Sequence, residues 1–359
     1  MYYQFSIQIV LRFLTTMNKQ HHISLKDLAN ELGVSVATVS RALRDSHEIG
    51  DEMKKRVLAL ARERHYRPNP FARGLRCDSP HIIGVLVPDL VTHYYAAVLD
   101  GIEDYAAQHG YSVISANSHE SFERESLALD NFMAMRVEGI VACLAQDTTD
   151  YSHFEHLHDM GVPVVFFART CLPELFSQVV ADGDVAAYKA TCHLLDTGSK
   201  RVAFIGGPNH LDMVKRRKHG YLQALRDHRI PIERELVACG KIDFDVARQA
   251  ALRLLTMSNR PDAILAFNDT ITYAAFNAIK ELKLRIPEDV AIIGFSEGDT
   301  SAFVTPKLTV IMDQAAEQGR TACELLIKAM NGDNRIYKKV IPMILKIRDS
   351  SMKSSAKRV

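Results

Sequence analysis

Hydrophobic side chains near the start of the chain recur every three to four residues, which is the period of an α-helix. The first such run contains Leu25, Leu28, Ala29 and Leu32. Ser24 and Asp27 have the spacing of a capping box at the start of this run. Gly33 follows it, and glycine ends a helix at little conformational cost. The pattern therefore predicts a short helix that begins after Ser24 and ends before Gly33.

A second short helix is predicted to begin after Ser35, with Val39, Ala42 and Leu43 pointing inward. Its outward positions are small, hydroxylated or cationic, and they are Val36, Ala37, Thr38, Ser40, Arg41 and Arg44. A face without carboxylates suits the major groove of DNA, where phosphates repel acids and base edges accept hydrogen bonds from arginine. The alternative is an ordinary helical hairpin in a core, which the two helices taken alone do not exclude.

A third helix is predicted over residues 50–65, where the apolar positions are Met53, Val57, Leu60 and Ala61. Residues 66–80 then read as a linker with a helix start, because Asn69 is a good N-cap and Pro70 suits the first helical position. A helix of under two turns is not stable alone in water. We therefore expect this segment to fold only when a partner holds it.

From His81 onward the pattern changes to alternating apolar strands and amphipathic helices. The strands are predicted at 82–87, 111–116, 139–145, 163–168, 201–206, 262–267, 290–295 and 308–312. The helices include 94–109, 122–136, 184–197, 214–228, 244–257 and 270–283. This alternation is typical of parallel sheets covered on both faces, and eight or nine strands fit two doubly wound lobes better than one sheet. A ligand is then expected in the crevice at the carboxyl ends of the strands.

Charge divides the chain in the same way as the hydrophobic pattern. The net charge of +1 combines +6 over residues 1–76 with −5 over the remainder, which favours an anionic partner for the first part only. None of the six cysteines pairs as C-x-x-C, which favours reduced thiols, and no apolar run is long enough to span a bilayer. Residues 1–16 lack the features of a signal peptide, and we expect them to be disordered or to precede a true start at Met17.

Signals for catalysis are weak. No glycine-rich phosphate loop and no nucleophile elbow is present. His153, His156 and His158 cluster on one segment, but their spacing places at most two on one helical face, so a solvated helix face is favoured over a metal site.

Polar residues at the carboxyl ends of the predicted strands are better candidates for a binding site. They are Asp89, Asn117, Arg169, Asp182, Asn268, Asp269, Ser296, Glu297, Asp313 and Gln314. Arg217 and Asp269 together could hold vicinal hydroxyl groups, as a sugar site requires.

The order of these parts resembles the LacI/GalR family of bacterial transcription repressors over about residues 23–351. The resemblance is strongest from Leu25 to Arg41 and from Tyr66 to Leu75. It implies a small all-α helix-turn-helix domain plus a two-lobed α/β domain of doubly wound parallel sheets, like a type I periplasmic binding protein. The implied divisions are an N-terminal extension (1–22), a helix-turn-helix domain (23–67), a hinge helix and linker (68–80), an effector domain (81–350) and a basic tail (351–359). One lobe would comprise about 81–180 with 309–340, and the other about 181–308 with 341–350.

The family's functional positions carry over residue by residue as expectations. Base contacts fall on Val36, Ala37 and Arg41, and phosphate contacts on Ser35, Thr38 and Ser40. The hinge residues are Asn69, Ala72, Arg73 and Leu75, the last of which matches a leucine that wedges into the minor groove. The effector residues are Tyr94, Tyr95, Asn117, Arg169, Arg217, Asn268, Asp269, Ser296 and Gln314. The implied partners are palindromic operator DNA, a small-molecule effector that is a sugar or sugar derivative, and a second copy of the chain, with a tetramer also open.

Two departures from the family pattern leave the effector open. Ala168 and Ser296 stand where many sugar-binding relatives have carboxylates. A different sugar, a more anionic ligand near Arg169 and Arg217, and a compound other than a sugar all remain compatible with the sequence.

The resemblance implies a cytoplasmic regulator without cofactor, metal or membrane segment. Two alternatives belong to other classes of protein. An exported solute-binding protein shares the two-lobed body but has no use for a basic head. An enzyme acting on a sugar in the crevice lacks a visible nucleophile, base and orienting residue.

Overall fold

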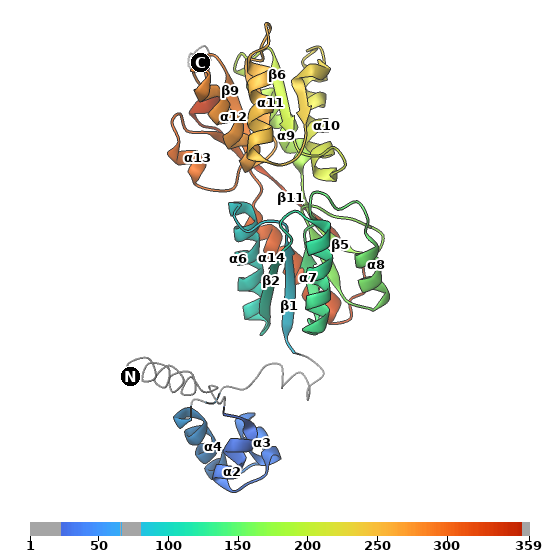
Figure 1. Ribbon diagram of the computed structural model, residues 1–359, viewed down its shortest axis with the longest axis vertical. Helices are drawn as coiled ribbons and strands as arrows, with labels where there is room; N and C mark the ends of the chain where they lie inside the picture. The colour runs from blue at the N-terminus through green and yellow to red at the C-terminus, as the bar shows by residue number, and fades with distance from the viewer. Residues whose placement is uncertain (1–22, 65, 67–79, 354–359) are drawn as a thin grey trace, which may run out of the picture. The chain divides into compact units, whose positions relative to one another are not determined.

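The computed structural model describes residues 23–64, 66 and 80–353. The chain divides into two compact units, one before and one after the bond between Pro80 and His81. Figure 1 shows the helical first unit in blue and the α/β second unit from cyan to red.

The first unit is a bundle of three helices, α2 (Leu25–Leu32), α3 (Val36–Leu43) and α4 (Asp51–Glu63). Both halves of the predicted capping box are present, since the Ser24 amide donates to Asp27 at 2.8 Å and the Asp27 amide donates to Ser24 Oγ at 3.2 Å. Gly33 ends α2 in the left-handed conformation at φ 66°. The shared core of the three helices consists of Leu28, Ala29, Val39, Ala42, Val57 and Ala61. All three predicted helices are therefore confirmed.

The second unit contains two six-stranded sheets, one in each lobe. In lobe 1 the strand order is β11 (Lys338–Ile341), β5 (Ser177–Ala181), β4 (Val164–Phe167), β3 (Gly139–Ala142), β1 (Ile82–Val87) and β2 (Ser112–Asn117). In lobe 2 it is β12 (Ile344–Lys346), β10 (Thr309–Met312), β9 (Ala291–Phe295), β8 (Ala263–Ala266), β6 (Val202–Gly206) and β7 (Val237–Cys239). Neighbouring strands are parallel except β10 and β12, which are antiparallel.

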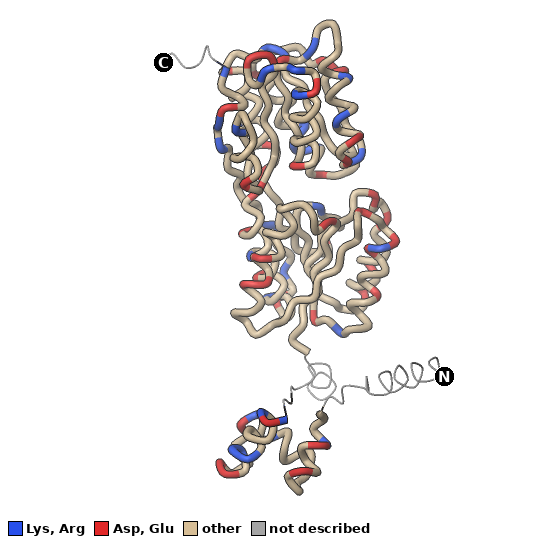
Figure 2. The backbone as a smooth tube through the Cα atoms, turned by 60° about the vertical axis from the view of Figure 1, so that its left-hand side comes forward, with Lys and Arg blue, Asp and Glu red and all other residues tan. Residues whose placement is uncertain are grey.

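Helices cover both faces of each sheet, as the alternating pattern predicts (Figure 1). Those of lobe 1 are α6 (His93–Gln108), α7 (Phe122–Ala134), α8 (Ser152–Asp159) and α14 (Ala315–Met330). Those of lobe 2 are α9 (Gly183–Asp196), α10 (Asp212–Asp227), α11 (Phe244–Leu255), α12 (Asp269–Glu281) and the short α13 (Thr300–Phe303). Short 3₁₀ turns occupy Arg234–Leu236 and Asp349–Ser351. Figure 2 shows the strands inside each lobe almost free of charged residues, which lie mainly on the surrounding helices and loops.

Helices α6 and α14 pack together on one face of the first sheet with unusually close backbones. A Cβ atom on Gly319 of α14 would lie 2.0 Å from the carbonyl oxygen of Val98 in α6. A Cβ atom on Gly101 of α6 would lie 2.1 Å from the carbonyl oxygen of Ala316 in α14. Only glycine permits this approach, so each helix supplies one glycine to the contact.

The chain passes between the lobes three times, after β5, after β10 and after β11. The expected lobe boundary at residue 309 is therefore wrong, because β10 pairs with β9 and β12 in lobe 2. The second crossing instead follows β10, near Asp313.

All eight predicted strands exist, but β5, β7, β11 and β12 were not predicted as strands. The last two are short, largely exposed edge strands, and Pro342 interrupts the apolar residues that they share, so the hydrophobic pattern did not identify either as a strand.

Two further observations concern the described residues alone. None of their helices is both long and apolar enough to cross a membrane. The five cysteines that they include are free thiols.

Candidate functional site

The first candidate site is the outer surface of α3. Five of the six predicted DNA-contact residues lie in this helix, and the sixth, Ser35, is its N-cap. Ala37 and Arg41 are exposed, and Thr38 and Ser40 are partly exposed. Val36 is also partly buried, because it packs against the core of the three helices. Ser35 caps the helix, since its Oγ accepts a hydrogen bond from the Thr38 amide at 3.1 Å. The contacts that these residues would make with DNA remain predictions.

Arg41 of α3 and Arg44, the C-cap residue that follows it, already have partners within this unit. Arg41 Nη1 donates to Glu48 Oε2 at 2.8 Å. Arg44 Nε donates to the carbonyl oxygen of Ser40 at 3.2 Å. The acid-free face predicted from the helix alone is therefore wrong in one respect, because the following loop brings a carboxylate to it. The helical pattern of α3 could not predict this carboxylate, because Glu48 lies in the loop after the helix.

The four predicted hinge residues, Asn69, Ala72, Arg73 and Leu75, lie outside the described residues. Their roles stay predictions from the sequence.

The second candidate site is a cleft of about 210 Å³ between the lobes of the second unit. It lies at the carboxyl ends of the strands of both sheets, as expected for doubly wound lobes. Its charged lining residues are Asp89, Glu120, Arg169, Arg217, Asp269, Glu297 and Asp313. Its aromatic lining residues are Tyr94, Tyr95, Phe267 and Phe295.

Six of the nine predicted effector residues line this cleft, and they are Tyr94, Tyr95, Arg169, Arg217, Asn268 and Asp269. The other three do not. Asn117 accepts the His119 amide at 2.8 Å in a local turn. Gln314 Nε2 donates to the carbonyl oxygen of Pro342 within the crossover segments. Ser296 is buried, with 1% of its surface exposed.

Arg169 is held by a carboxylate that the sequence analysis missed. Its Nη2 donates to Glu120 Oε1 at 2.9 Å and its Nη1 to Glu120 Oε2 at 2.5 Å. Arg169 Nη1 also donates to the carbonyl oxygen of Leu144 at 3.1 Å. Glu120 lies three residues beyond the end of β2, so extending the search for strand-end residues by one turn would have found it.

Arg217 is held in the same way, by Asp313. Its Nη2 lies 2.9 Å and 3.3 Å from the two carboxylate oxygens of Asp313, and its Nη1 donates to the carbonyl oxygen of Phe267. The guanidinium carbon also lies 3.7 Å from the centre of the Phe295 ring, a cation–π contact. Burial raises the pKa of Asp313 to about 6, a shift that Arg217 opposes and Glu297 adds to. Arg217 and Asp269 both line the cleft, as expected, but the guanidinium of Arg217 is already paired with Asp313, so its hold on ligand hydroxyl groups stays a prediction.

Asp269 also lines this wall of the cleft, where the Ser296 side chain and the Glu297 backbone are hydrogen-bonded to its carboxyl group. Burial raises its pKa, although the side chain of Ser296 and nearby positive charge oppose the shift. Asn268 caps α12, where its Oδ1 accepts the Ile271 amide at 3.0 Å. On the opposite lobe, the Tyr94 hydroxyl donates to Gln318 Oε1 at 2.9 Å. The cleft thus combines aromatic rings with acceptor oxygens.

The histidine cluster of α8 does not form a simple solvated face. His156 and His158 are exposed, but only 9% of the His153 side chain is. His153 Nε2 lies 2.9 Å from Oε1 of the fully buried Glu125. The expectation was wrong for His153, because α8 packs against the first turn of α7, which supplies Glu125. Among the described residues, no group of three His, Cys, Asp or Glu side chains could hold a metal ion.

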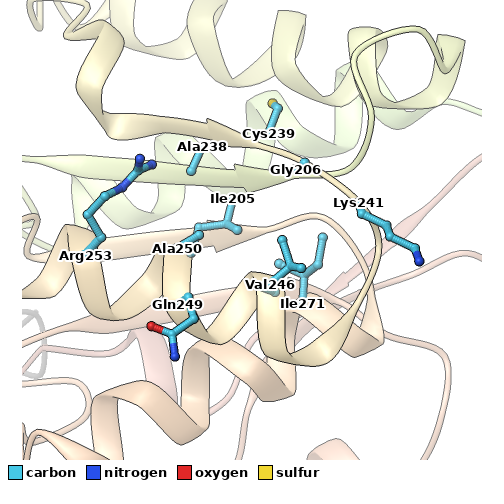
Figure 3. A pocket seen from close by; sticks show the side chains of 12 residues that line it. Ile205, Gly206, Ala238, Cys239, Lys241, Val246, Gln249, Ala250, Arg253 and Ile271 are labelled. Carbon is cyan, nitrogen blue, oxygen red and sulfur yellow. The ribbon is translucent and has the colours of Figure 1, made fainter.

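A second hollow of about 310 Å³ lies in lobe 2 beside α11 and the edge strand β7. Figure 3 shows Arg253 and Lys241 toward its opposite ends, with Ile205 and Ala250 between them. None of the predicted effector residues lines it.

Comparison with known proteins matches each of the two units to a family. Residues 24–69 match the family described as bacterial regulatory proteins, lacI family. Residues 80–348 match the family described as periplasmic binding proteins and sugar binding domain of LacI family.

Curated relatives extend the similarity over most of the chain. Catabolite control protein A of Priestia megaterium is 32% identical, over 86% of this chain and 93% of that protein. The HTH-type transcriptional repressor CytR of Escherichia coli K12 is 32% identical, over 87% of this chain and 91% of that protein. Among solved structures, the lac repressor dimer bound to operator and an anti-inducer has the same fold, with a TM-score of 0.81 at 23% identity, over 92% of this chain and 99% of that one.

Proposed function

The chain belongs to the LacI family of bacterial regulatory proteins, and we propose that it represses an operon in response to a neutral, hydroxyl-rich effector. It is a DNA-binding transcriptional regulator with a helix-turn-helix head and a two-lobed effector domain. The head, matched over residues 24–69, distinguishes it from an exported solute-binding protein. The relatives are regulators. We therefore assign the cleft a role in binding and not in catalysis. We also place the protein in the cytoplasm, where it would reach the bacterial DNA.

The proposed operator is a palindrome of roughly 14–18 bp that a homodimer reads with two copies of α3. Support comes from the exposed side chains of Ala37 and Arg41 on a capped helix. An apolar contact from Ala37 and a bidentate contact from Arg41 would read adjacent base pairs. The net charge of +6 over residues 1–76 adds the nonspecific attraction to phosphates.

The effector proposal is carried by one observation, that both arginines facing the cleft are already neutralised. Arg169 is paired with Glu120, and Arg217 with Asp313. A phosphate or carboxylate ligand would have to displace one of these carboxylates and would also face Asp269. Hydroxyl groups would instead donate to the acceptor oxygens of the cleft, while the faces of a ring pack against its aromatic side chains. Of the possibilities that the sequence leaves open, a neutral sugar ring, free or within a nucleoside, therefore fits better than an anion.

The proposal is tested by two measurements on the full chain. Selection from random DNA should enrich a palindrome whose binding weakens steeply with salt, and recovery of no common sequence would contradict specific recognition. A thermal-shift screen should then compare neutral sugars and nucleosides with the corresponding phosphates. A ligand raises the melting temperature by mass action, so stabilisation by phosphorylated compounds alone would refute the neutral effector.

A further inference from the structure

Gln146 of lobe 1 makes two hydrogen bonds to lobe 2. His210 Nε2 lies 2.6 Å from the carbonyl oxygen of Gln146, and the Ile242 amide donates to Gln146 Oε1 at 2.9 Å. A carbonyl oxygen only accepts, so His210 is the donor in the first bond. One residue of lobe 1 thus receives hydrogen bonds from two separate segments of lobe 2.

These contacts lie far from the segments that connect the lobes. In the second sheet, β12 and β10 adjoin the crossovers at one side, whereas β6 and β7 form the other side. His210 follows β6 and Ile242 follows β7. Contacts near the crossovers, such as that of the Met343 amide with Asp182 at 2.7 Å, lie where the chain itself already joins the lobes. Gln146 instead joins the side where the lobes are free to separate.

The loop that carries Gln146 is fixed within lobe 1 by two carboxylates. The Gln146 amide donates to Glu120 Oε2 at 2.7 Å, and the Ala145 amide donates to Glu125 Oε2 at 2.6 Å. Thr148 Oγ1 donates to Glu125 Oε1 at 2.8 Å. Gln146 itself has 5% of its surface exposed. A loop anchored in this way moves with lobe 1 as a rigid part.

The same anchor connects Gln146 to the cleft. Glu120, which accepts the Gln146 amide, also holds Arg169, and both line the cleft. Ile242 lines the cleft from the other lobe. A ligand that contacts Glu120 on one lobe or Ile242 on the other therefore touches a residue that is hydrogen-bonded to Gln146.

We propose that Gln146, His210 and Ile242 form a latch that holds the two lobes closed and senses the contents of the cleft through Glu120. The sensing role rests on the proposed function of the cleft, whereas the closing role does not. Because both bonds end on one residue, separation of the lobes breaks them together. Loss of either bond should then increase the population of the open form.

Hydrogen exchange of the Ile242 amide in the full chain tests the latch without any ligand. In Gln146→Met, which keeps the side-chain length but removes the acceptor, exchange should be on the order of fivefold or more faster, as expected for loss of one net hydrogen bond. In His210→Ala, exchange of the same amide should also accelerate several-fold, although His210 and Ile242 bond different oxygen atoms of Gln146. His210 is exposed, so this second variant should fold even if the first does not.

Gln223→Ala is the matched control, because this amide side chain bonds only Asp227 and Arg226 on the surface of lobe 2. Exchange of the Ile242 amide in Gln223→Ala should equal that in the wild type. Faster exchange in Gln146→Met alone would overturn the latch, since it would show that the bond from Ile242 does not depend on the bond from His210. Unchanged exchange in both variants would also overturn it.

Operator binding by the wild type is measured separately, so a failure of the proposed function is distinguishable from a failure of the latch.

Discussion

Arg41 and Glu48 form an ion pair across the end of α3, with 2.8 Å between Nη1 and Oε2. Both side chains are about half exposed, at 46% and 54%. The arginine proposed to read a base is therefore occupied by a carboxylate when DNA is absent. Glu48 must give up Arg41, or turn with it, before Arg41 can contact a base edge.

Replacing Glu48 by glutamine should tighten operator binding. Exposed ion pairs contribute up to about 1 kcal/mol, so release of Arg41 should lower the operator Kd by roughly two- to fivefold. Fluorescence anisotropy at fixed salt measures this change. Glu52→Gln removes the same charge from the exposed start of α4 and controls for net charge. Equal gains in the two variants would show that charge alone, and not the pairing with Arg41, is responsible.

Replacing Arg41 by alanine should weaken operator binding by about 1–3 kcal/mol and relax the preference at one base pair in each half-site. Binding to a panel of operators with single substitutions provides the measurement. Arg62→Ala, on an exposed position of α4, is the matched control and should keep the full preference. An unchanged preference in Arg41→Ala would count against base reading by this residue.

Replacing Leu75 by alanine should reduce specific binding more than nonspecific binding. The reason is the wedge role that the family resemblance implies, in which an apolar side chain unstacks the central base step. Parallel titrations with operator and with random DNA compare the two. Equal losses on both DNAs would contradict the wedge.

The Asp313 carboxyl should make stability depend on pH in a direction opposite to that of a surface carboxylate. Its pKa is raised by burial from 3.8 to about 6, so the folded state holds its proton more tightly than the unfolded state. The contribution of the protonated Asp313 carboxyl to the free energy of unfolding is therefore complete below pH 3.8 and is lost as the pH rises through about 6.

Asp313→Asn cannot titrate, so the comparison with wild type isolates this contribution. The stability of the wild type relative to the variant should fall by on the order of 3 kcal/mol between pH 4 and pH 7. Denaturant midpoints at several pH values measure the difference. A difference that is constant, or that grows with pH, would refute the assignment.

Replacing Gly319 by alanine should destabilise lobe 1 by about 3 kcal/mol, because the new Cβ would meet backbone atoms of α6 that cannot move aside cheaply. Thermal unfolding gives the measurement. Gly50→Ala is the control, since Gly50 has φ −63° and no atom within 4 Å of the added Cβ. Similar melting temperatures for Gly319→Ala and wild type would show that the two helices can separate slightly at no cost.

Local patterns in the sequence were sufficient for most of the fold. Periodic apolar positions and the caps at Ser24 and Ser35 specified the three helices of the head, because such signals depend on residues a few positions apart. Apolar runs likewise identified eight strands. The same reasoning failed for β11 and β12, which are short, exposed and stabilised by pairing with distant strands.

The sequence by itself determined the family, the two units and six residues that line the cleft, because strand ends in doubly wound lobes converge at one edge. Only the tertiary structure decided which charges meet. Glu120 reaches Arg169, Asp313 reaches Arg217 and Glu48 reaches Arg41 through loops and crossovers whose paths depend on packing. Those three pairings turn apparently free arginines into neutralised ones, and this electrostatic balance decides which ligands the cleft and the head can accept.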